Sequence, residues 1–148
     1  MTAARRTRVV VGRTLPEVIT ASGYAIIRPE DFDFTPPSKG DQARGVMRLS
    51  ELLGQSRANI WKMPPGSRGR RHRERTQEEI FVSLDGTATL FLGEAAVAVT
   101  LPRGSLALVE PGTPVQLANE GADDAIVLIV GAPPTVGDAE YLPSAVVE

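Results

Sequence analysis

The chain has 148 residues, a net charge of -2 and 42% hydrophobic residues, which is typical of one globular domain that can bury an ordinary core. This charge balance excludes the strongly basic surface of nucleic-acid-binding domains, so we expect no nucleic acid partner. Because there is no cysteine, disulfides and thiolate metal sites are excluded, and the cytoplasm is the expected location. No stretch approaches the roughly 18 apolar residues of a membrane span, so we expect no membrane partner either.

Residues 1–44 are predicted to form an N-terminal extension that precedes the main domain. Thr14 is a suitable helix cap, Glu17 stands at the capping-box position three residues later, and Gly23 is a suitable stop. We therefore expect a short N-terminal helix between Thr14 and Gly23. Residues 29–40 carry three prolines and no periodicity, which predicts a loop lying across the main domain. Two further runs favour short strands, at residues 7–11 and 24–27.

From residue 45 onward, short apolar or alternating runs recur between Gly, Pro and Asp turns. Many short strands at such spacing are typical of an all-β sandwich or barrel, and no helical period competes with them here. We expect one all-β domain over residues 45–131. The tail at residues 132–148 loses periodicity and is expected either to be loose or to pack through Tyr141 and Leu142 on the barrel or on a second subunit. The predicted strands lie at residues 46–53, 58–63, 80–84, 88–92, 95–101, 105–109, 114–119 and 125–130.

The only histidine of the chain lies in the stretch 64–86, close to two glutamates. His72 and Glu74 are two residues apart, so on a strand both side chains leave the same face. Glu79 opens a second apolar run, which ends at the dipeptide Asp85-Gly86, a strong hairpin signal. If the two runs lie side by side, His72, Glu74 and Glu79 converge on one site.

The spacing of these residues resembles the first motif of the cupin superfamily, Gly-x5-His-x-His-x3 or x4-Glu-x6-Gly. The chain has Gly66, His72, Glu74, Glu79 and Gly86 at the corresponding positions. Every spacing agrees, and Glu74 replaces the second histidine of the motif.

The second cupin motif, Gly-x5-Pro-x-Gly-x2-His-x3-Asn, falls on residues 104–119. The two glycines and Asn119 match, whereas Glu110 stands where the family has proline and Val115 where it has histidine. Together the two motifs resemble those of a small, single-domain cupin with a reduced set of metal ligands.

This resemblance implies a double-stranded β-helix, also called a jelly-roll barrel. The strand-like N-terminal residues suggest a homodimer through pairing of sheet edges, which is also the commonest state among cupins. The resemblance also implies a divalent metal held by His72, Glu74 and Glu79, since the hydrocarbon of Val115 cannot ligate an ion. The expected ions are manganese, iron, nickel or zinc, because exchanging imidazole for carboxylate disfavours copper. An alternative without metal stays open, in which His72, Glu74 and a basic neighbour such as Arg70 form a hydrogen-bonded polar cluster.

The expected ligand pocket is apolar and lies beside the three donors. It is formed by Trp61, Met63, Phe81 and Val115, although for Met63 and Val115 an ordinary place in the core is favoured. We expect a small organic ligand. It is bound either by a metal-dependent oxygenase, isomerase or decarboxylase, or by a metal-free, non-enzymatic module that binds or senses it. Five arginines at residues 68–75 favour a solvated strand face, with contact to an anion as the alternative.

Overall fold

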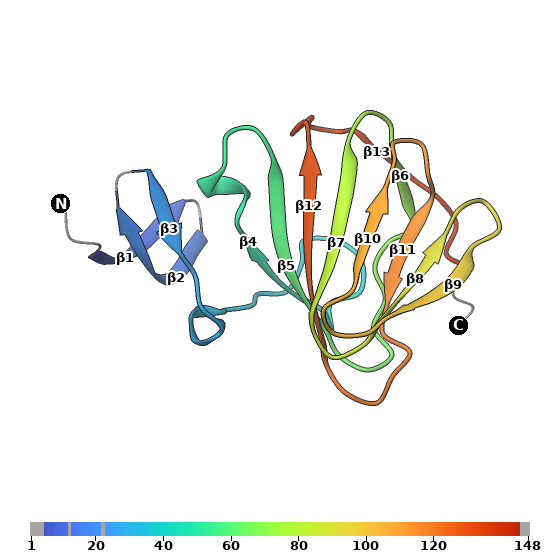
Figure 1. Cartoon of the computed structure of the whole chain (residues 1–148), viewed down its shortest axis with the longest axis horizontal. Coiled ribbons are helices and arrows are strands. Elements are labelled where there is room, and N and C mark those ends of the chain that lie inside the picture. The colour runs from blue at the N-terminus through green and yellow to red at the C-terminus, as the bar shows by residue number, and fades with distance from the viewer. Residues whose placement is uncertain (1–4, 12, 22, 146–148) are drawn as a thin grey trace.

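A computed structural model gives the fold and describes residues 5–11, 13–21 and 23–145. Two five-stranded antiparallel sheets face each other and form a jelly-roll barrel (Figure 1), which confirms the predicted all-β fold. The strand order of one sheet is β10 (Leu106–Val109), β7 (Glu78–Asp85), β12 (Ala125–Ala132), β5 (Arg57–Met63) and β4 (Gly45–Arg48). The order of the other is β13 (Ala139–Tyr141), β6 (His72–Glu74), β11 (Val115–Ala118), β8 (Ala88–Leu92) and β9 (Val97–Leu101).

The short N-terminal helix predicted from Thr14 to Gly23 is wrong. These residues fall largely in β2 (Arg13–Ala21), the central strand of a small sheet with β1 (Arg5–Val11) and β3 (Tyr24–Ile26). Ile19 of β2 lies opposite Arg6 on one side and Ile26 on the other. The β-branched residues of β2 favour extended backbone, and pairing on both sides supplies more hydrogen bonds than a helix of one or two turns. This sheet lies to one side of the barrel, next to β4 (Figure 1).

The strands predicted from residue 45 onward are present, with differences in extent. The run at residues 46–53 divides into β4 and a single 3-10 turn, η2 (Ser50–Leu52). The strand expected from residue 95 begins at Val97, because residues 93–96 form a turn closed by the Ala96 N–H and the Gly93 carbonyl. The segment 29–40 is mostly irregular, as predicted, and contains the 3-10 turn η1 (Pro29–Asp31).

The tail packs on the barrel. Strand β13 pairs with β6, so that Tyr141 lies opposite His72 and Ala139 opposite Glu74. The aperiodic sequence had left this open, because a strand of three residues is too short to have a recognisable period.

The dipeptide Asp85-Gly86 forms a turn, but this turn joins strands of opposite sheets and does not form the predicted hairpin. Strand β7 already pairs with β10 on one side and β12 on the other, so β8 has no free edge of β7 to join. Gly86 has a φ of +68°, and a Cβ there would collide with the carbonyl oxygen of Asp124. Glycine is therefore required at this crossing by both conformation and space.

The space between the sheets is filled by an apolar cluster drawn from both of them. Its buried members are Met63, Phe81, Ala88, Leu90, Leu101, Val109, Val115, Leu117, Ala125 and Val127. Among the described residues, none belongs to a helix that is long and apolar enough to cross a membrane.

Candidate functional site

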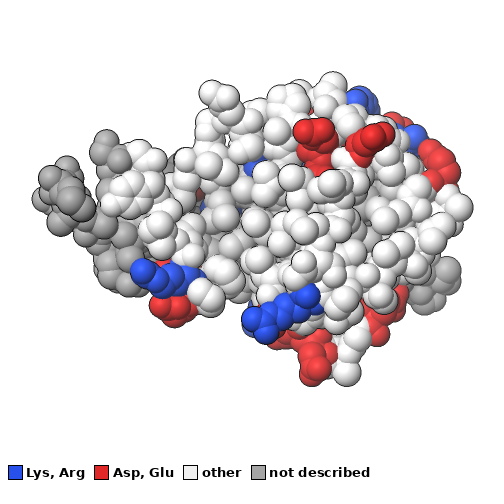
Figure 2. Space-filling model, viewed as in Figure 1, with Lys and Arg blue, Asp and Glu red and all other residues white. Residues whose placement is uncertain are grey.

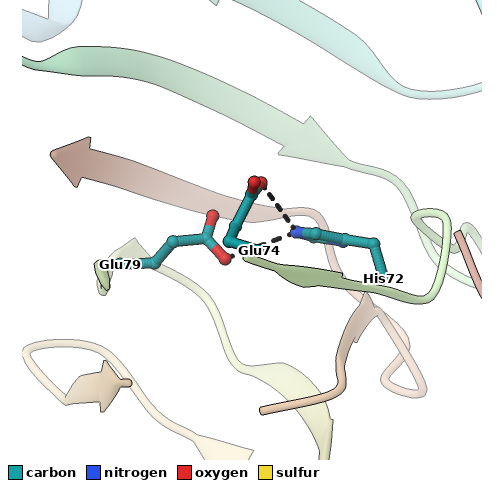
Figure 3. Close-up of side chains that lie close together, drawn as sticks. All are labelled: His72, Glu74 and Glu79. Carbon is teal, nitrogen blue, oxygen red and sulfur yellow. Dashed lines mark hydrogen bonds and ion pairs between the residues drawn. The ribbon is translucent and has the colours of Figure 1, made fainter. Parts of the chain in front are cut away.

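Two consecutive strands bring the three predicted donors together (Figure 3). His72 and Glu74 leave the same face of β6, and Glu79 comes from β7 in the opposite sheet. The Nε2 atom of His72 lies 3.4 Å from Oε1 of Glu74 and 3.3 Å from Oε1 of Glu79. On its other side, Nδ1 of His72 lies 3.1 Å from the carbonyl oxygen of Arg70. The convergence that the spacing suggested is present in the fold.

The carboxylates of this site are buried: Glu74 and Glu79 are each 8% exposed. Burial alone would lower the pKa of His72, but hydrogen bonds to Glu74 and Glu79, together with the charge of Glu79, raise it to about 10. Without a metal, His72 is therefore protonated at neutral pH and bridges the two carboxylates. Both of its ring nitrogens then act as donors, which suits the carbonyl oxygen of Arg70.

The same three side chains have the composition and spacing of a metal site. One ligand atom from each of His72, Glu74 and Glu79 can be chosen so that all lie within 4.8 Å of one another. In addition, the Oε2 atom of Glu74 is buried without a hydrogen-bond partner. A buried carboxylate oxygen without a partner is costly, and a cation beside it would remove that cost. The donor set therefore fits a divalent ion.

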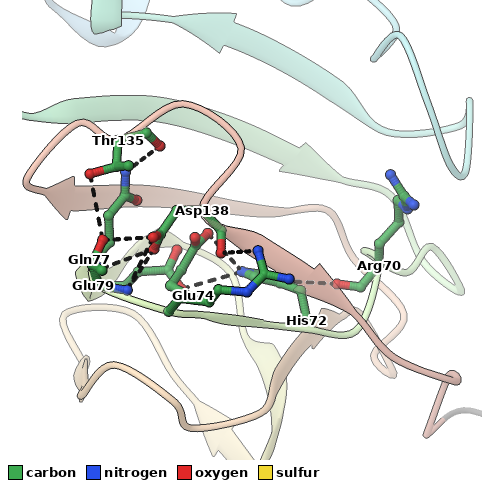
Figure 4. A network of polar contacts seen from close by, with 9 residues as sticks. Arg70, His72, Glu74, Gln77, Glu79, Thr135 and Asp138 are labelled. Atoms are coloured by element: carbon green, nitrogen blue, oxygen red, sulfur yellow. Dashed lines mark hydrogen bonds and ion pairs between the residues drawn. The ribbon is translucent and has the colours of Figure 1, made fainter.

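A network around Asp138 holds the turn that joins β6 to β7 (Figure 4). The Asp138 carboxylate accepts hydrogen bonds from the backbone N–H groups of Thr76 and Gln77, at 2.9 and 3.0 Å, and from the Thr76 hydroxyl, at 2.6 Å. Burial alone would raise the pKa of Asp138, but these hydrogen bonds hold it well below its usual range. Because the turn lies between Glu74 and Glu79, Asp138 positions both carboxylates.

Sequence reasoning missed Asp138, which lies in the aperiodic tail. The only available signal was an isolated acidic residue after Gly137, and that pattern is equally common in exposed turns.

A cavity of about 580 Å³ lies beside the three donors. Of the four residues predicted to line the ligand pocket, Trp61 and Phe81 do so. Met63 and Val115 do not line it; they are 0% and 1% exposed and belong to the buried core. Val46, Leu117, Ile129 and Ala139 are further apolar residues of its lining, and the segment 37–39 lies along the same cavity.

Val115 stands where the family motif has a histidine, and its place in the fold agrees with that correspondence. It lies directly opposite His72 in the pairing of β11 with β6. Its side chain packs in the core, so hydrocarbon occupies the position from which a fourth ligand would reach the site.

The arginines at residues 68–75 contact other groups of the protein, whereas a solvated face predicts contacts with water alone. Arg73 pairs with Glu94 at 3.1 Å and with Glu140 at 3.3 Å, and Arg71 donates to the carbonyl oxygen of Gly93 at 3.3 Å. The guanidinium of Arg70 lies over the ring of Tyr141, 3.4 Å from its centroid. Among the described residues, His72 is the only cation that forms an ion pair with Glu74 or Glu79.

The match to a family model agrees with this architecture. Residues 59–131 match the model described as a cupin domain, and they include every residue of the first motif and its His/Glu/Glu cluster. The chain belongs to the cupin superfamily. No curated protein sequence matches this cupin.

Solved structures with the same fold include three of similar size. An uncharacterised conserved protein with a double-stranded beta-helix domain from Klebsiella pneumoniae is 22% identical, with a TM-score of 0.61 over 75% of this chain and 92% of that one. A sugar phosphate isomerase of the cupin superfamily from Silicibacter pomeroyi is 17% identical, with a TM-score of 0.65 over 80% and 92%. The polyketide cyclase RemF from Streptomyces resistomycificus is 14% identical, with a TM-score of 0.69 over 81% and 86%. At these identities the likeness establishes the cupin fold.

Proposed function

We propose that this cupin binds a small organic ligand in its cavity, beside a divalent metal held by His72, Glu74 and Glu79. The observation that carries the proposal is the convergence of three ligand atoms within 4.8 Å, next to a cavity of about 580 Å³. The unsatisfied Oε2 atom of Glu74 supports it further, because an ion would give that oxygen a partner. One imidazole and two carboxylates suit manganese, iron, nickel or zinc.

Different residues would have different roles in such a site. Phe81 and Ile129 exclude water from one wall, and Trp61 offers an aromatic surface on which a planar ligand can lie. Three protein donors leave coordination positions free for a ligand. When bound, a divalent ion supplies a Lewis acid that polarises an oxygen of the ligand.

This arrangement favours a metal-dependent enzyme, of the oxygenase, isomerase or decarboxylase kind. Structures of the same fold include the sugar phosphate isomerase named above and a predicted oxalate decarboxylase from Thermotoga maritima, which is 20% identical. These two proteins share the fold of this chain, and their names state the reactions. The reaction class is therefore part of the proposal.

Elemental analysis of protein purified without affinity tag or chelator tests the metal. We expect near-stoichiometric manganese, iron, nickel or zinc in the wild type and its loss in Glu79→Gln, which keeps the shape of the side chain but removes its charge. Glu78→Gln is a matched control, because Glu78 is exposed and does not line the cavity. It should retain the metal. If all three proteins lack metal, and added divalent ions do not raise the melting temperature, the metal site is not used.

A metal-free module that binds or senses a small ligand is the second candidate. It is favoured by a specific observation: the imidazolium of His72 already bridges Glu74 and Glu79 and neutralises part of their charge. In that case the cluster of His72, Glu74 and Glu79 stabilises the barrel. The purified protein would then contain no metal and would still bind a small ligand in the cavity.

A further inference from the structure

The cavity concentrates positive charge, although the whole chain is negative. Its lining includes the five basic residues Lys39, Arg44, Arg48, Arg57 and Arg70, against the three acidic residues Glu51, Glu74 and Glu79. Two of those acids belong to the His72 cluster, where both already pair with His72. The net charge of the chain is -2, so this local surplus is not a property of the protein as a whole. Charge of one sign along a concave wall raises the local concentration of ions of the opposite sign.

Among the described residues, Arg48 and Arg57 are the two arginines of this group whose side chains have no partner within the protein. Both line the cavity from the sheet that also carries Glu79. Within the part of the chain that the structure describes, neither side chain makes a hydrogen bond or an ion pair with another residue. By contrast, Arg44 donates to the carbonyl oxygens of Asp41 and Lys39 and lies over Trp61.

The register of the sheet fixes how far these arginines lie from the metal donors. Arg57 is opposite Gly131 of β12, and Gly131 is opposite Glu79 of β7. Arg57 is therefore two strands from Glu79, a backbone separation of about 10 Å. A molecule of a few carbon atoms can span that distance once the side chains extend toward each other.

Arg48 lies in the neighbouring row of the same sheet. Arg48 is opposite Asn59 of β5, and Asn59 is two residues from Arg57 on the same strand. The two arginines therefore occupy neighbouring rows on the cavity face of the sheet. The Oδ1 atom of Asn59 is buried without a hydrogen-bond partner and lines the cavity. An unsatisfied acceptor on the residue that neighbours both arginines in the sheet suits a ligand that has both an anionic group and a hydroxyl.

We propose that the cavity binds a small organic anion, whose carboxylate or phosphate group is bound by Arg48 and Arg57, on the wall that also carries Glu79. Guanidinium groups bind both kinds of oxyanion through paired N–H donors. This inference rests on the proposed use of the cavity as a ligand site, and it does not require the metal.

The single tryptophan makes the test direct, since Trp61 lines the cavity and reports on its contents through fluorescence. Metal-free protein, prepared by dialysis against a chelator that is then removed, is titrated with malonate, with inorganic phosphate and with uncharged malonamide. We expect a saturable change with malonate or phosphate, weakened by added salt, and none with malonamide. The tighter of the two anions identifies the carboxylate or the phosphate as the natural group.

Variants identify the residues responsible. Arg48→Gln combined with Arg57→Gln should weaken anion binding about tenfold or more, since each lost contact is a charge-assisted hydrogen bond. Arg103→Gln is the matched control, because Arg103 is exposed and does not line the cavity. Arg57→Gln alone changes an exposed side chain and serves if the double variant does not fold.

Three results would overturn the inference: equal binding by wild type and arginine variants, equal binding of malonamide and malonate, or no saturable response to any probe. The metal content of the same variants separates this inference from the proposed metal site. Loss of metal in Glu79→Gln, with anion binding in the metal-free form at least as tight as in the wild type, would support both proposals independently.

Discussion

At the scale of single residues, the raised pKa of His72 makes the stability of the metal-free protein depend on pH. The pKa in the folded state is about 10 and the ordinary value is 6.5, so the stabilisation is complete below about pH 6.5 and is lost as the pH rises toward 10. We predict that metal-stripped protein becomes easier to unfold in urea over this window. His72→Gln should have a flatter dependence, and an equally steep loss in that variant would contradict the prediction.

Removing His72 leaves Glu74 and Glu79 buried without their cation. We predict that His72→Ala destabilises the metal-free protein by about 3–5 kcal/mol, the range measured when one partner of a buried ion pair is deleted. The free energy of unfolding, obtained from urea titrations at pH 7, is compared with that of Arg103→Ala, which changes an exposed side chain. A loss no greater than that of the control would mean that the two carboxylates are relieved in another way.

At the scale of structural elements, the turn between β6 and β7 depends on the tail. Asp138 accepts hydrogen bonds from Thr76 and Gln77, and this turn sets the distance between Glu74 and Glu79. We predict that Asp138→Ala lowers metal affinity about 10- to 100-fold, as the loss of groups that orient metal ligands does. Asp138→Asn keeps one acceptor and should lose less.

Isothermal titration with manganese or zinc measures this effect. Asp123→Ala provides the control, because the side chain of Asp123 is exposed and does not line the cavity. If Asp138→Ala and Asp123→Ala bind metal alike, the network around Asp138 supports the fold without positioning the site.

At the scale of the whole molecule, the homodimer predicted from the sequence stays a prediction, and the structure suggests a surface for it. Leu106 and Leu108 are 63% and 77% exposed, and Leu108 lies opposite Ile80 on the outer face of β7 and β10. Figure 2 shows this side of the barrel with few charged side chains. A contiguous exposed apolar surface is typical of a contact between subunits.

Light scattering at micromolar concentration tests the dimer. We expect twice the chain mass of 15.8 kDa for the wild type and a single chain for Leu108→Asp. Val136→Asp, at another exposed apolar residue, should leave the mass unchanged. If the dimer persists in Leu108→Asp, pairing at the edges of β1 or β3 becomes the better explanation. A monomeric wild type would remove the dimer altogether.

The sequence determined the parts of this protein that depend on local rules. Alternation with a period of two placed His72 and Glu74 on one face, and glycine spacing located the turns, because both are set by backbone geometry over a few residues. The motif spacing was enough to predict the barrel and the three donors.

Only the tertiary structure decided the features that depend on pairing between distant strands. Pairing on both sides turned the predicted N-terminal helix into β2, and it gave β13 a place beside β6. The sheet register also brought Arg57 within two strands of Glu79, 22 positions further along the chain, so that basic residues lie beside an acidic cluster. Such contacts follow from hydrogen bonding across the whole sheet, and no local pattern in the sequence encodes them.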